Sequence, residues 1–278
     1  IKHILSTAYA KLNGLKIVMD CSNGANSEIA PVILRSLGAE VVAIFNEPNG
    51  ININNGCGST HLEALQKKVR EVGANVGIAN DGDADRCLAV DENGEAMDGD
   101  QIMLICALEL MKRNKLHDNM LVTTVMSNVG LHQAMKAHGG KTVKTAVGDR
   151  YVLENMRKNG YNIGGEQSGH IIFREDMPTG DGELSAIQLM RVMKLTGEPL
   201  SVLAGRMPIT PQVLLNVAAD RDMKEALHES PEMEALIEEC EHRLGDTGRI
   251  LIRASGTEPL IRVMVEGEDS ALIRELAE

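Results

Sequence analysis

Residues 76–86 read VGIANDGDADR, a short apolar run followed by three aspartates at every second position. The apolar run predicts a buried strand, and the small residues between the aspartates leave the backbone free to curl. Three like charges at the end of a strand repel one another unless a cation lies among them. This stretch therefore predicts a strand that ends in a loop of convergent carboxylates.

The loop has the chemistry of a divalent metal site. Asp81, Asp83 and Asp85 offer carboxylate oxygens, which are the ligands that Mg²⁺ prefers in proteins. A solvated acidic turn is the alternative, and the preceding strand, the third aspartate and Arg86 favour the metal site over it. The loop also lacks the longer spacing and the closing Glu of an EF-hand. We expect one Mg²⁺ at these three aspartates.

Strands and helices alternate around this loop, which indicates an α/β unit with a mostly parallel sheet. In such sheets ligands bind beyond the carboxyl ends of the strands, where the aspartate loop is expected. The expected strands are 15–20, 41–45, 76–79, 87–90 and 95–98, and the expected helices are one ending near residue 38, 61–72 and 100–114.

Two further regions follow. The second repeats the order of elements, and the third, after Pro208 and Pro211, has the pattern of an α+β domain on an antiparallel sheet. The second has expected strands 121–126, 142–145 and 162–164 and helices 131–138, 151–158 and 181–195; the third has strands 213–218, 250–253 and 260–265 and helices 223–228, 232–244 and 270–278. We therefore expect two successive α/β domains with mixed, mostly parallel sheets, at 1–115 and 116–207, and a C-terminal α+β domain at 208–278, with a hinge near residues 207–211.

Composition limits the functional classes. A hydrophobic share of 43% in 278 residues suffices for packed cores. A net charge of −12 argues against nucleic acid or an acidic membrane as partner, and the absence of Trp with only 3 Tyr and 2 Phe removes stacking platforms. Five scattered cysteines without metal spacing indicate reduced thiols, and neither a signal peptide nor a long apolar run is present. We expect a cytoplasmic protein.

The segment between the last two expected strands has a composition suited to a phosphate group. Arg253 and Arg262 offer guanidinium groups, Ser255 and Thr257 offer hydroxyls, and Gly256 offers a backbone amide that a ligand can approach closely. An ordinary hairpin with surface arginines fits the spacing equally well.

A second glycine-rich loop, GGEQSGH at 164–170, follows another expected strand. Glu166 and Ser168 are two residues apart and suited to holding adjacent sugar hydroxyls. His170 is suited to moving a proton near neutral pH, although a histidine taken alone is more often structural.

The turn VGDRY at 147–151 joins an expected strand to an expected helix. Asp149 fits a helix N-cap as well as a ligand contact. Arg150 is expected at the same end of the sheet, where an anion can meet it.

Four of these motifs, in this order, resemble the α-D-phosphohexomutase family. They are DGDADR at 81–86, VGDRYV at 147–152, GEQSGH at 165–170 and RASGTEPLIRVMVEG at 253–267. The match covers nearly the whole chain, and the last three motifs are most similar to bacterial members that act on glucosamine phosphates. The resemblance implies four domains, of which this chain holds the second, third and fourth.

The resemblance implies roles for most of the candidate residues. Arg86 would lie beside the reacting phosphoryl group, Glu166 and Ser168 would hold the sugar, and the loop after residue 252 would hold the phosphate that does not react. We therefore predict as catalytic Arg86 and His170; as substrate-binding Glu166, Ser168, Asp149, Arg150, Arg253, Ser255, Gly256, Thr257 and Arg262; and as Mg²⁺ ligands Asp81, Asp83 and Asp85.

The implied reaction interconverts glucosamine 6-phosphate and glucosamine 1-phosphate through a 1,6-bisphosphate, and feeds UDP-N-acetylglucosamine and cell-wall synthesis. The phosphoserine loop of the family, of Ser-His-Asn-Pro type, does not occur in this sequence. We therefore expect it in a missing N-terminal domain and expect no turnover by this chain alone. Asn80 stands where the family usually has Phe, and we expect this to cost apolar packing under the metal loop.

Three alternatives stay open. Family members that act on mannose or glucose phosphates differ in few residues of the sugar loop. A metal-dependent phosphatase with an aspartyl nucleophile is a second, although Ala84 and Asp85 fit its motif poorly. A non-catalytic phosphosugar-binding protein is the third. The expected partner is a phosphosugar, and the sequence is compatible with a homodimer without requiring one.

Overall fold

The computed structural model of this protein describes residues 1–227, 230–255 and 258–278. These residues form two compact units, of which the first comprises 1–127 with 131–207 and the second 128–130 with 208–278. Gly256, Thr257 and the last residue of the helix expected at 223–228 lie outside the described residues.

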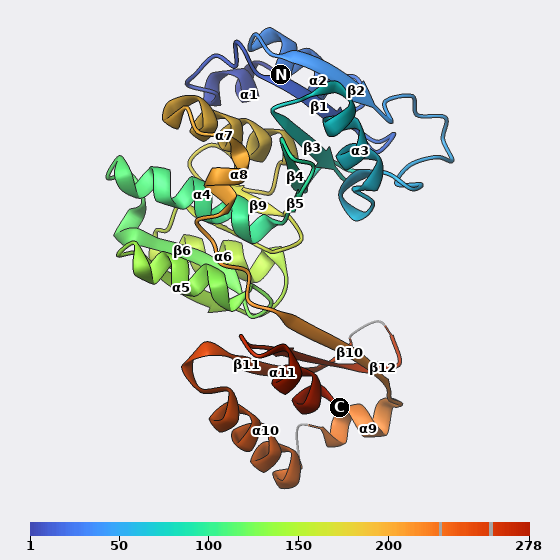
Figure 1. Ribbon diagram of the computed structural model, residues 1–278, viewed down its shortest axis with the longest axis vertical. Helices are drawn as coiled ribbons and strands as arrows, with labels where there is room; N and C mark the ends of the chain where they lie inside the picture. The colour runs from blue at the N-terminus through green and yellow to red at the C-terminus, as the bar shows by residue number, and fades with distance from the viewer. Residues whose placement is uncertain (228–229, 256–257) are drawn as a thin grey trace. The chain divides into compact units, whose positions relative to one another are not determined.

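The first sheet of unit 1 has five strands in the order β2-β1-β3-β4-β5 (Figure 1). β1 pairs in parallel with β2 and β3, whereas β3 with β4 and β4 with β5 are antiparallel. The strands are β1 Lys16–Asp20, β2 Glu40–Ile44, β3 Val76–Asn80, β4 Cys87–Asp91 and β5 Ala96–Met97. The helices around this sheet are α1 Lys2–Thr7, α2 Ile29–Ser36, α3 Glu63–Val72 and α4 Gly99–Lys112, with the short helix η1 Gly58–Thr60.

Both faces of this sheet are covered, which explains why its strands are continuous apolar runs. Successive residues of β1 face opposite sides. Val18 packs with the cluster of α3, whereas Ile17 and Met19 join the larger core that includes α2 and α4. All five residues of β3 are buried, so the strand delivers the following loop from a fixed position.

The second sheet repeats the connectivity, with four strands in the order β7-β6-β8-β9. β6 pairs in parallel with β7 and β8, and β8 pairs antiparallel with β9. The strands are β6 Met120–Thr124, β7 Lys141–Thr145, β8 Ile163–Gly165 and β9 Ile171–Phe173. The helices that follow or connect them are α5 Val129–Ala137, α6 Asp149–Asn159, α7 Gly182–Thr196 and α8 Leu200–Ala204, with η2 His117–Asn119.

Two helices join the cores of the two sheets. In α4 the first ten residues are all buried, and in α7 twelve consecutive residues from Gly182 are buried. A helix buried on all sides belongs to an interior. α4 and α7 pack against each other; α4 also contacts β4 and β8, and α7 contacts β3, β4 and β9. One core therefore runs through unit 1 from one sheet to the other.

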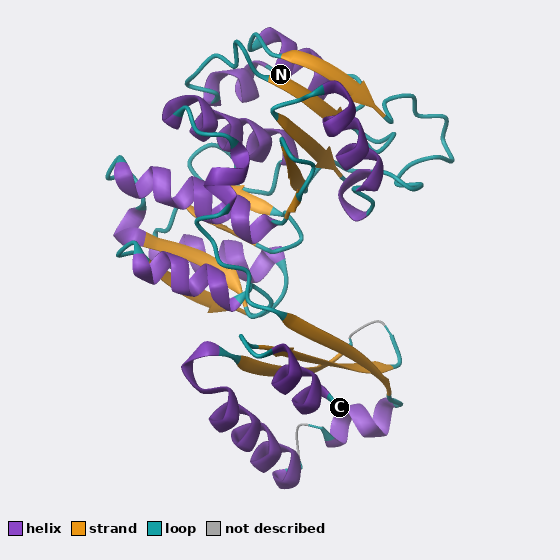
Figure 2. Cartoon of the chain, viewed as in Figure 1, coloured by secondary structure: helices purple, strands orange, loops and turns teal. Residues whose placement is uncertain are grey.

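Unit 2 is built on an antiparallel sheet in the order β10-β12-β11, with its three helices on one face (Figure 2). The elements are β10 Gln212–Ala218, α9 Arg221–Ala226, α10 Pro231–Leu244, η3 Gly245–Thr247, β11 Arg249–Ala254, β12 Leu260–Glu266 and α11 Ser270–Ala277. α11 packs on β10 and β12, and α10 packs on β11. Within this unit the Asn128 side chain bonds both backbone groups of Thr210, which lies in the segment expected as a hinge.

The predicted fold class is confirmed: the two α/β sheets are mixed and the C-terminal sheet is antiparallel. Among the short elements, β9 and α8 were not predicted. β9 has only three residues, too few for a periodic pattern, and it forms because β8 offers it an antiparallel edge. Among the described residues, no helix combines the length and the apolar character needed to cross a membrane.

Candidate metal and sugar-phosphate site

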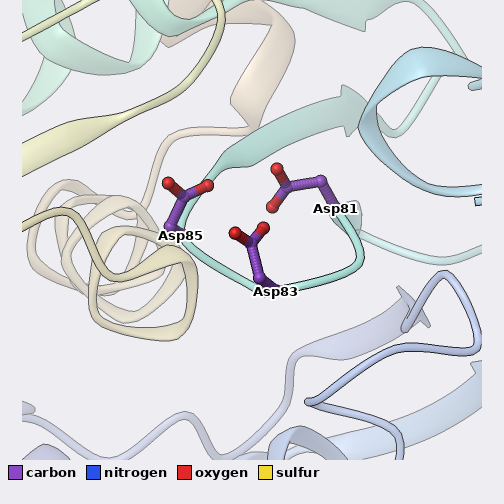
Figure 3. Close-up of side chains that lie close together, drawn as sticks. All are labelled: Asp81, Asp83 and Asp85. Atoms are coloured by element: carbon purple, nitrogen blue, oxygen red, sulfur yellow. The ribbon is translucent and has the colours of Figure 1, made fainter. Parts of the chain in front are cut away.

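The three aspartates after β3 converge as predicted. One ligand oxygen from each of Asp81, Asp83 and Asp85 lies within 4.8 Å of the others. Figure 3 shows the side chains on one curved loop with their carboxylates facing one another. Asp83 is exposed and the other two are half-buried, so the cluster is open to solvent on one side.

Hydrogen bonds from two other segments hold the backbone of the aspartate loop in place. The Ala25 N–H donates to the Gly82 carbonyl at 2.8 Å, and the Gly182 N–H donates to the Ala84 carbonyl at 2.9 Å. A Cβ at Gly24 would lie 2.2 Å from the Gly82 oxygen, so this close approach requires glycine at position 24. The loop is therefore seated on the turn after β1 and on the start of α7.

Asn80 is fully buried, yet both ends of its amide are bonded. Its Nδ2 donates to the Arg86 carbonyl at 2.8 Å, and its Oδ1 accepts from Asn26 Nδ2 at 3.0 Å. Asn80 thus makes a polar connection across the loop, which the comparison with Phe did not predict.

The electrostatics of the loop favour a bound cation. Burial raises the pKa of Asp81; the backbone N–H of Arg86 opposes this rise, and the neighbouring Asp85 adds to it. Arg86 Nε lies 3.6 Å from Asp81 Oδ2 and 3.8 Å from Asp85 Oδ1, and its side chain is 43% exposed. One half-exposed guanidinium therefore pairs with two of the three carboxylates, which leaves negative charge in excess at the cluster.

A divalent cation fits this donor set. All the donors are hard carboxylate oxygens, and Asp85 Oδ1 is buried without a hydrogen bond in the described part of the chain. Arg86 Nε, 3.8 Å away, is too distant to donate a hydrogen bond to this oxygen, so its lone pairs are open to a cation. Mg²⁺ takes few protein carboxylates and keeps part of its water shell, which suits an open three-aspartate cluster.

His170 connects the second loop to the first. Its Nδ1 lies 3.0 Å from Asp85 Oδ2, and its Nε2 accepts the Gly180 N–H at 3.2 Å. Because a backbone N–H can only donate, Nε2 must be unprotonated in this hydrogen bond and Nδ1 must carry the proton toward Asp85. The second carboxylate nearby, Asp149 Oδ2, lies 3.8 Å from Nε2. In this arrangement both ring nitrogens are occupied.

The remaining predicted sugar contacts lie on the same side of unit 1. Glu166 is half-buried, and its Oε1 accepts the Gly148 N–H at 3.0 Å, so Oε2 is available to a ligand. Ser168 is exposed. Arg150 is exposed and pairs with Glu154 at 2.8 Å on the surface of α6, where a surface ion pair holds it.

In unit 2, Arg253 on β11 and Arg262 on β12 are direct cross-strand partners. Like charges in this position destabilise a sheet. Burial, and then the charge of Arg262, lower the pKa of Arg253. An anion between the two guanidinium groups would relieve both costs.

Ser255 follows β11 and is buried, with its hydroxyl accepting the Glu258 N–H at 3.2 Å. Lys224 Nζ donates to the Ser255 carbonyl at 2.7 Å and to the Glu258 carbonyl, so α9 holds both sides of this segment. Arg262 also pairs with Glu258 at 2.6 Å. Of the predicted phosphate ligands, Gly256 and Thr257 lie outside the described residues.

Sequence reasoning missed the segments that support the metal loop. The turn after β1 has left-handed backbone at Ser22 and Asn23, and the Asn23 side chain bonds the N–H of Glu47 and the carbonyl of Asn52. The segment 48–60, rich in Gly and Asn, indicates only a loop from its sequence. Both segments are rich in asparagine, which tolerates left-handed backbone. This composition was the available sign of tightly turned support segments.

The sequence matches three family profiles that together cover most of the chain. They are "Phosphoglucomutase/phosphomannomutase, alpha/beta/alpha domain II" at residues 1–94, "alpha/beta/alpha domain III" at 98–209 and "C-terminal domain" at 214–278.

Among curated relatives, phosphoglucosamine mutase of Syntrophotalea carbinolica is 57% identical over 96% of this chain and 58% of its own length. That of Symbiobacterium thermophilum is 55% identical over 100% of this chain and 61% of its own length. The chain thus spans about three fifths of the length of these relatives.

Solved structures with the same fold have low sequence identity. A phosphoglucomutase/phosphomannomutase family protein of Burkholderia thailandensis superimposes with a TM-score of 0.80 at 23% identity, covering 99% of this chain and 61% of that one. N-acetylphosphoglucosamine mutase of Aspergillus fumigatus, solved with GlcNAc-6P and magnesium, gives a TM-score of 0.80 at 20% identity, covering 99% and 67%.

Proposed function

This chain belongs to the phosphoglucomutase/phosphomannomutase family, and on that premise we propose that it is part of a phosphosugar mutase that interconverts glucosamine 6-phosphate and glucosamine 1-phosphate. The relatives at 55–57% identity, which are phosphoglucosamine mutases, support the amino sugar as substrate. Through this product the proposed enzyme feeds UDP-N-acetylglucosamine and peptidoglycan synthesis.

One observation carries the proposal: the aspartate loop and the sugar loop meet. His170 reaches Asp85 at 3.0 Å, and the Cys87 N–H donates to the Gly169 carbonyl at 3.0 Å. A phosphoryl group at the aspartates would therefore lie next to a sugar held by the second loop. A solvated acidic turn does not account for this contact.

We propose that Asp81, Asp83 and Asp85 hold Mg²⁺, which supplies charge stabilisation to the phosphoryl group in transfer. Phosphoryl transfer needs little covalent chemistry from the protein, so positioning and electrostatics dominate. The Arg86 side chain lies beside the cluster with 43% of its surface exposed, which supports a contact with phosphoryl oxygens.

We propose that the second loop, residues 164–170, binds the sugar. Glu166 Oε2 and the exposed Ser168 hydroxyl are the proposed contacts to sugar hydroxyls. His170 donates a hydrogen bond from Nδ1 to Asp85. Its proposed part in catalysis is therefore to orient that carboxylate. Asp149 and Arg150, at the start of α6, complete the proposed substrate contacts.

We propose that the unit 2 loop holds the phosphate that does not react. The facing Arg253 and Arg262 and the buried Ser255 support this role. Gly256 and Thr257 stay predicted ligands of the same group.

The proposal includes a phosphoserine donor outside residues 1–278, and a division of this chain into domains at 1–115, 116–207 and 208–278. It also includes a cytoplasmic location, which the five cysteines, all buried with free thiols, support. The donor is proposed because the implied reaction needs a phosphoserine, and the Ser-His-Asn-Pro type of loop that carries it in the family does not occur in this sequence.

The test is an assay of the full-length protein with Mg²⁺, glucosamine 6-phosphate and a catalytic amount of the 1,6-bisphosphate. Phosphorus NMR would follow the appearance of the 1-phosphate. Glucose and mannose 6-phosphates run in parallel separate the sugar specificities, and release of inorganic phosphate alone would reveal a phosphatase. Tight binding of the sugar phosphate without exchange between positions 1 and 6 would sink the mutase proposal.

A further inference from the structure

The metal loop shows an alternation that its sequence alone does not explain. The odd positions 81, 83 and 85 carry the converging carboxylates, and the carbonyls of the even positions 82, 84 and 86 all accept hydrogen bonds. Backbone N–H groups satisfy the first two carbonyls. The third, at Arg86, is bonded by the side chain of Asn80. Of these three hydrogen bonds, only the one to the Arg86 carbonyl has a side-chain donor. It can therefore be removed by a point mutation, whereas the other two come from the backbone.

The orientation of the Asn80 amide follows from its partners. The Arg86 carbonyl can only accept, so the Asn80 group that faces it is the NH₂ group, at 2.8 Å. Asn80 Oδ1 must then face Asn26, whose own NH₂ group donates to it at 3.0 Å. Asn80 is 0% exposed and Asn26 is 9% exposed, so water does not compete for either bond.

Arg86 passes this restraint to the metal ligands. Its own N–H donates to Asp81 Oδ1 at 3.1 Å, and it directly follows Asp85 in the chain. Asn80 itself lies at the end of β3, immediately before Asp81. The side chain of Asn80 therefore closes the loop from its first residue to its last, with the three carboxylates between.

We propose that Asn80, oriented by Asn26, is a positioning residue that sets the affinity of the metal site for divalent cations. This inference rests on the proposed metal-binding role of the three aspartates and goes beyond it, because neither asparagine touches the metal. Groups behind metal ligands typically contribute a factor of about ten to a hundred in metal affinity. A purely structural amide pair would instead change only the free energy of unfolding.

The test uses Mn²⁺ as a paramagnetic probe on the full-length protein, with free Mn²⁺ followed by electron spin resonance. Asn80→Leu keeps the size of the side chain and removes both hydrogen bonds. We expect Mn²⁺ to bind about tenfold to a hundredfold more weakly to this variant. Asn26→Ala tests the same device through its second member and should weaken binding in the same direction. The double variant should bind no more weakly than Asn80→Leu, because Asn26 acts through Asn80.

Asn75 provides a matched control at the opposite end of β3. Its Oδ1 accepts the Lys16 N–H at 2.8 Å, so Asn75→Ala also removes a bond between a side chain and the backbone. We expect this variant to unfold at a lower urea concentration and to bind Mn²⁺ like the wild type.

The outcomes separate the two proposals. If Asp83→Asn abolishes Mn²⁺ binding while Asn80→Leu and Asn26→Ala bind as tightly as the wild type, the positioning inference is wrong and the metal site stands. If the wild type and Asp83→Asn bind Mn²⁺ alike, the metal site itself is wrong and the inference fails with it. Should Asn80→Leu fail to fold, Asn26→Ala decides alone: unchanged affinity overturns the inference, and weakened affinity supports it.

Discussion

The two sheets of unit 1 share their connectivity and differ in the loops that their third strands deliver. β3 pairs in parallel with β1 and antiparallel with β4, and β8 pairs in parallel with β6 and antiparallel with β9. The loop after β3 carries three carboxylates, whereas the loop after β8 carries Glu166, Ser168 and His170. The fold therefore determines where a functional loop lies, and the side chains alone determine whether it suits a cation or a sugar.

The first strands of the two sheets in chain order, β1 and β6, allow the same comparison. β1 ends at Asp20 and β6 ends at Thr124, both fully buried. Asp20 Oδ1 accepts the Ser22 N–H at 2.8 Å, and Thr124 Oγ1 accepts the Met126 N–H at 3.2 Å, two residues onward in each case. Only the aspartate carries a charge into the interior. At this equivalent position the first sheet therefore buries an ionisable group, whereas the second sheet buries a neutral one.

The largest expected effect breaks the first loop. Asp83→Asn removes one of three carboxylates from the cluster, and we expect kcat/KM of the full-length enzyme to fall by about a thousandfold. Binding of glucosamine 6-phosphate, measured by calorimetry without metal, should change little. Full activity in this variant would contradict the assignment of the loop.

The next effect concerns Asp20 and acidity. Burial raises its pKa from 3.8 to about 6, against the lowering effect of the Gly58 and Ser22 N–H groups. Because the folded-state pKa lies above the unfolded value, the stability from this group is full below about pH 4 and is lost as pH rises to about 6, by about 3 kcal/mol.

The measurement is urea unfolding of the wild type and Asp20→Asn from pH 4 to pH 7. The difference between their free energies of unfolding should decline over that interval, because only the wild type carries the titrating carboxyl. Thr124→Val, the equivalent change under the second sheet, should show a constant difference. If the free energies of unfolding of the wild type and Asp20→Asn ran parallel from pH 4 to pH 7, the pH dependence would not come from Asp20.

A third change separates the two loops. Glu166→Gln keeps an oxygen for the Gly148 N–H but removes the charge that would strengthen the proposed bonds to sugar hydroxyls. We expect kcat/KM to fall about tenfold to a hundredfold, since a hydrogen bond to a charged group contributes about 1.5–3 kcal/mol. Mn²⁺ affinity should be that of the wild type, and a weaker metal site would show that the loops do not act separately.

The smallest effect lies outside both sheets of unit 1. Arg253→Gln relieves the repulsion from Arg262, and we expect stability in phosphate-free buffer to rise by a few tenths of a kcal/mol. Inorganic phosphate should then no longer raise Tm, as it should in the wild type. Arg243→Gln, which disrupts a surface pair with Glu275, serves as control and should retain the response to phosphate.

Much of this architecture could be predicted from patterns. The alternation of apolar runs and helices predicted the mixed sheets. The expected strands 87–90 and 95–98 form the hairpin of β4 and β5, with Gly94 at a φ of +85° in its turn. The convergence of the aspartates was also predictable, because side chains at alternate positions share one side of a curved backbone. These features are local, and local rules suffice for them.

The rest depends on contacts between distant residues. Asn26 and Asn80 are 54 positions apart, and Asp85 and His170 are 85 positions apart. No periodicity encodes such pairs. The second ring nitrogen of His170 is occupied by a backbone N–H at Gly180, which no sequence motif specifies. The proton-moving role of His170 stays a prediction. In this geometry both ring nitrogens are already hydrogen-bonded, to Asp85 and to the Gly180 N–H.

The interior that α4 and α7 share across both sheets has a consequence for how the protein comes apart. The connection between the sheets passes through η2, at His117–Asn119 on the surface. A protease that cuts there would sever the chain without separating the pieces, because the same buried helices are packed against each fragment. Unit 1 of such a nicked protein should still melt in a single cooperative transition, as one folding unit rather than two.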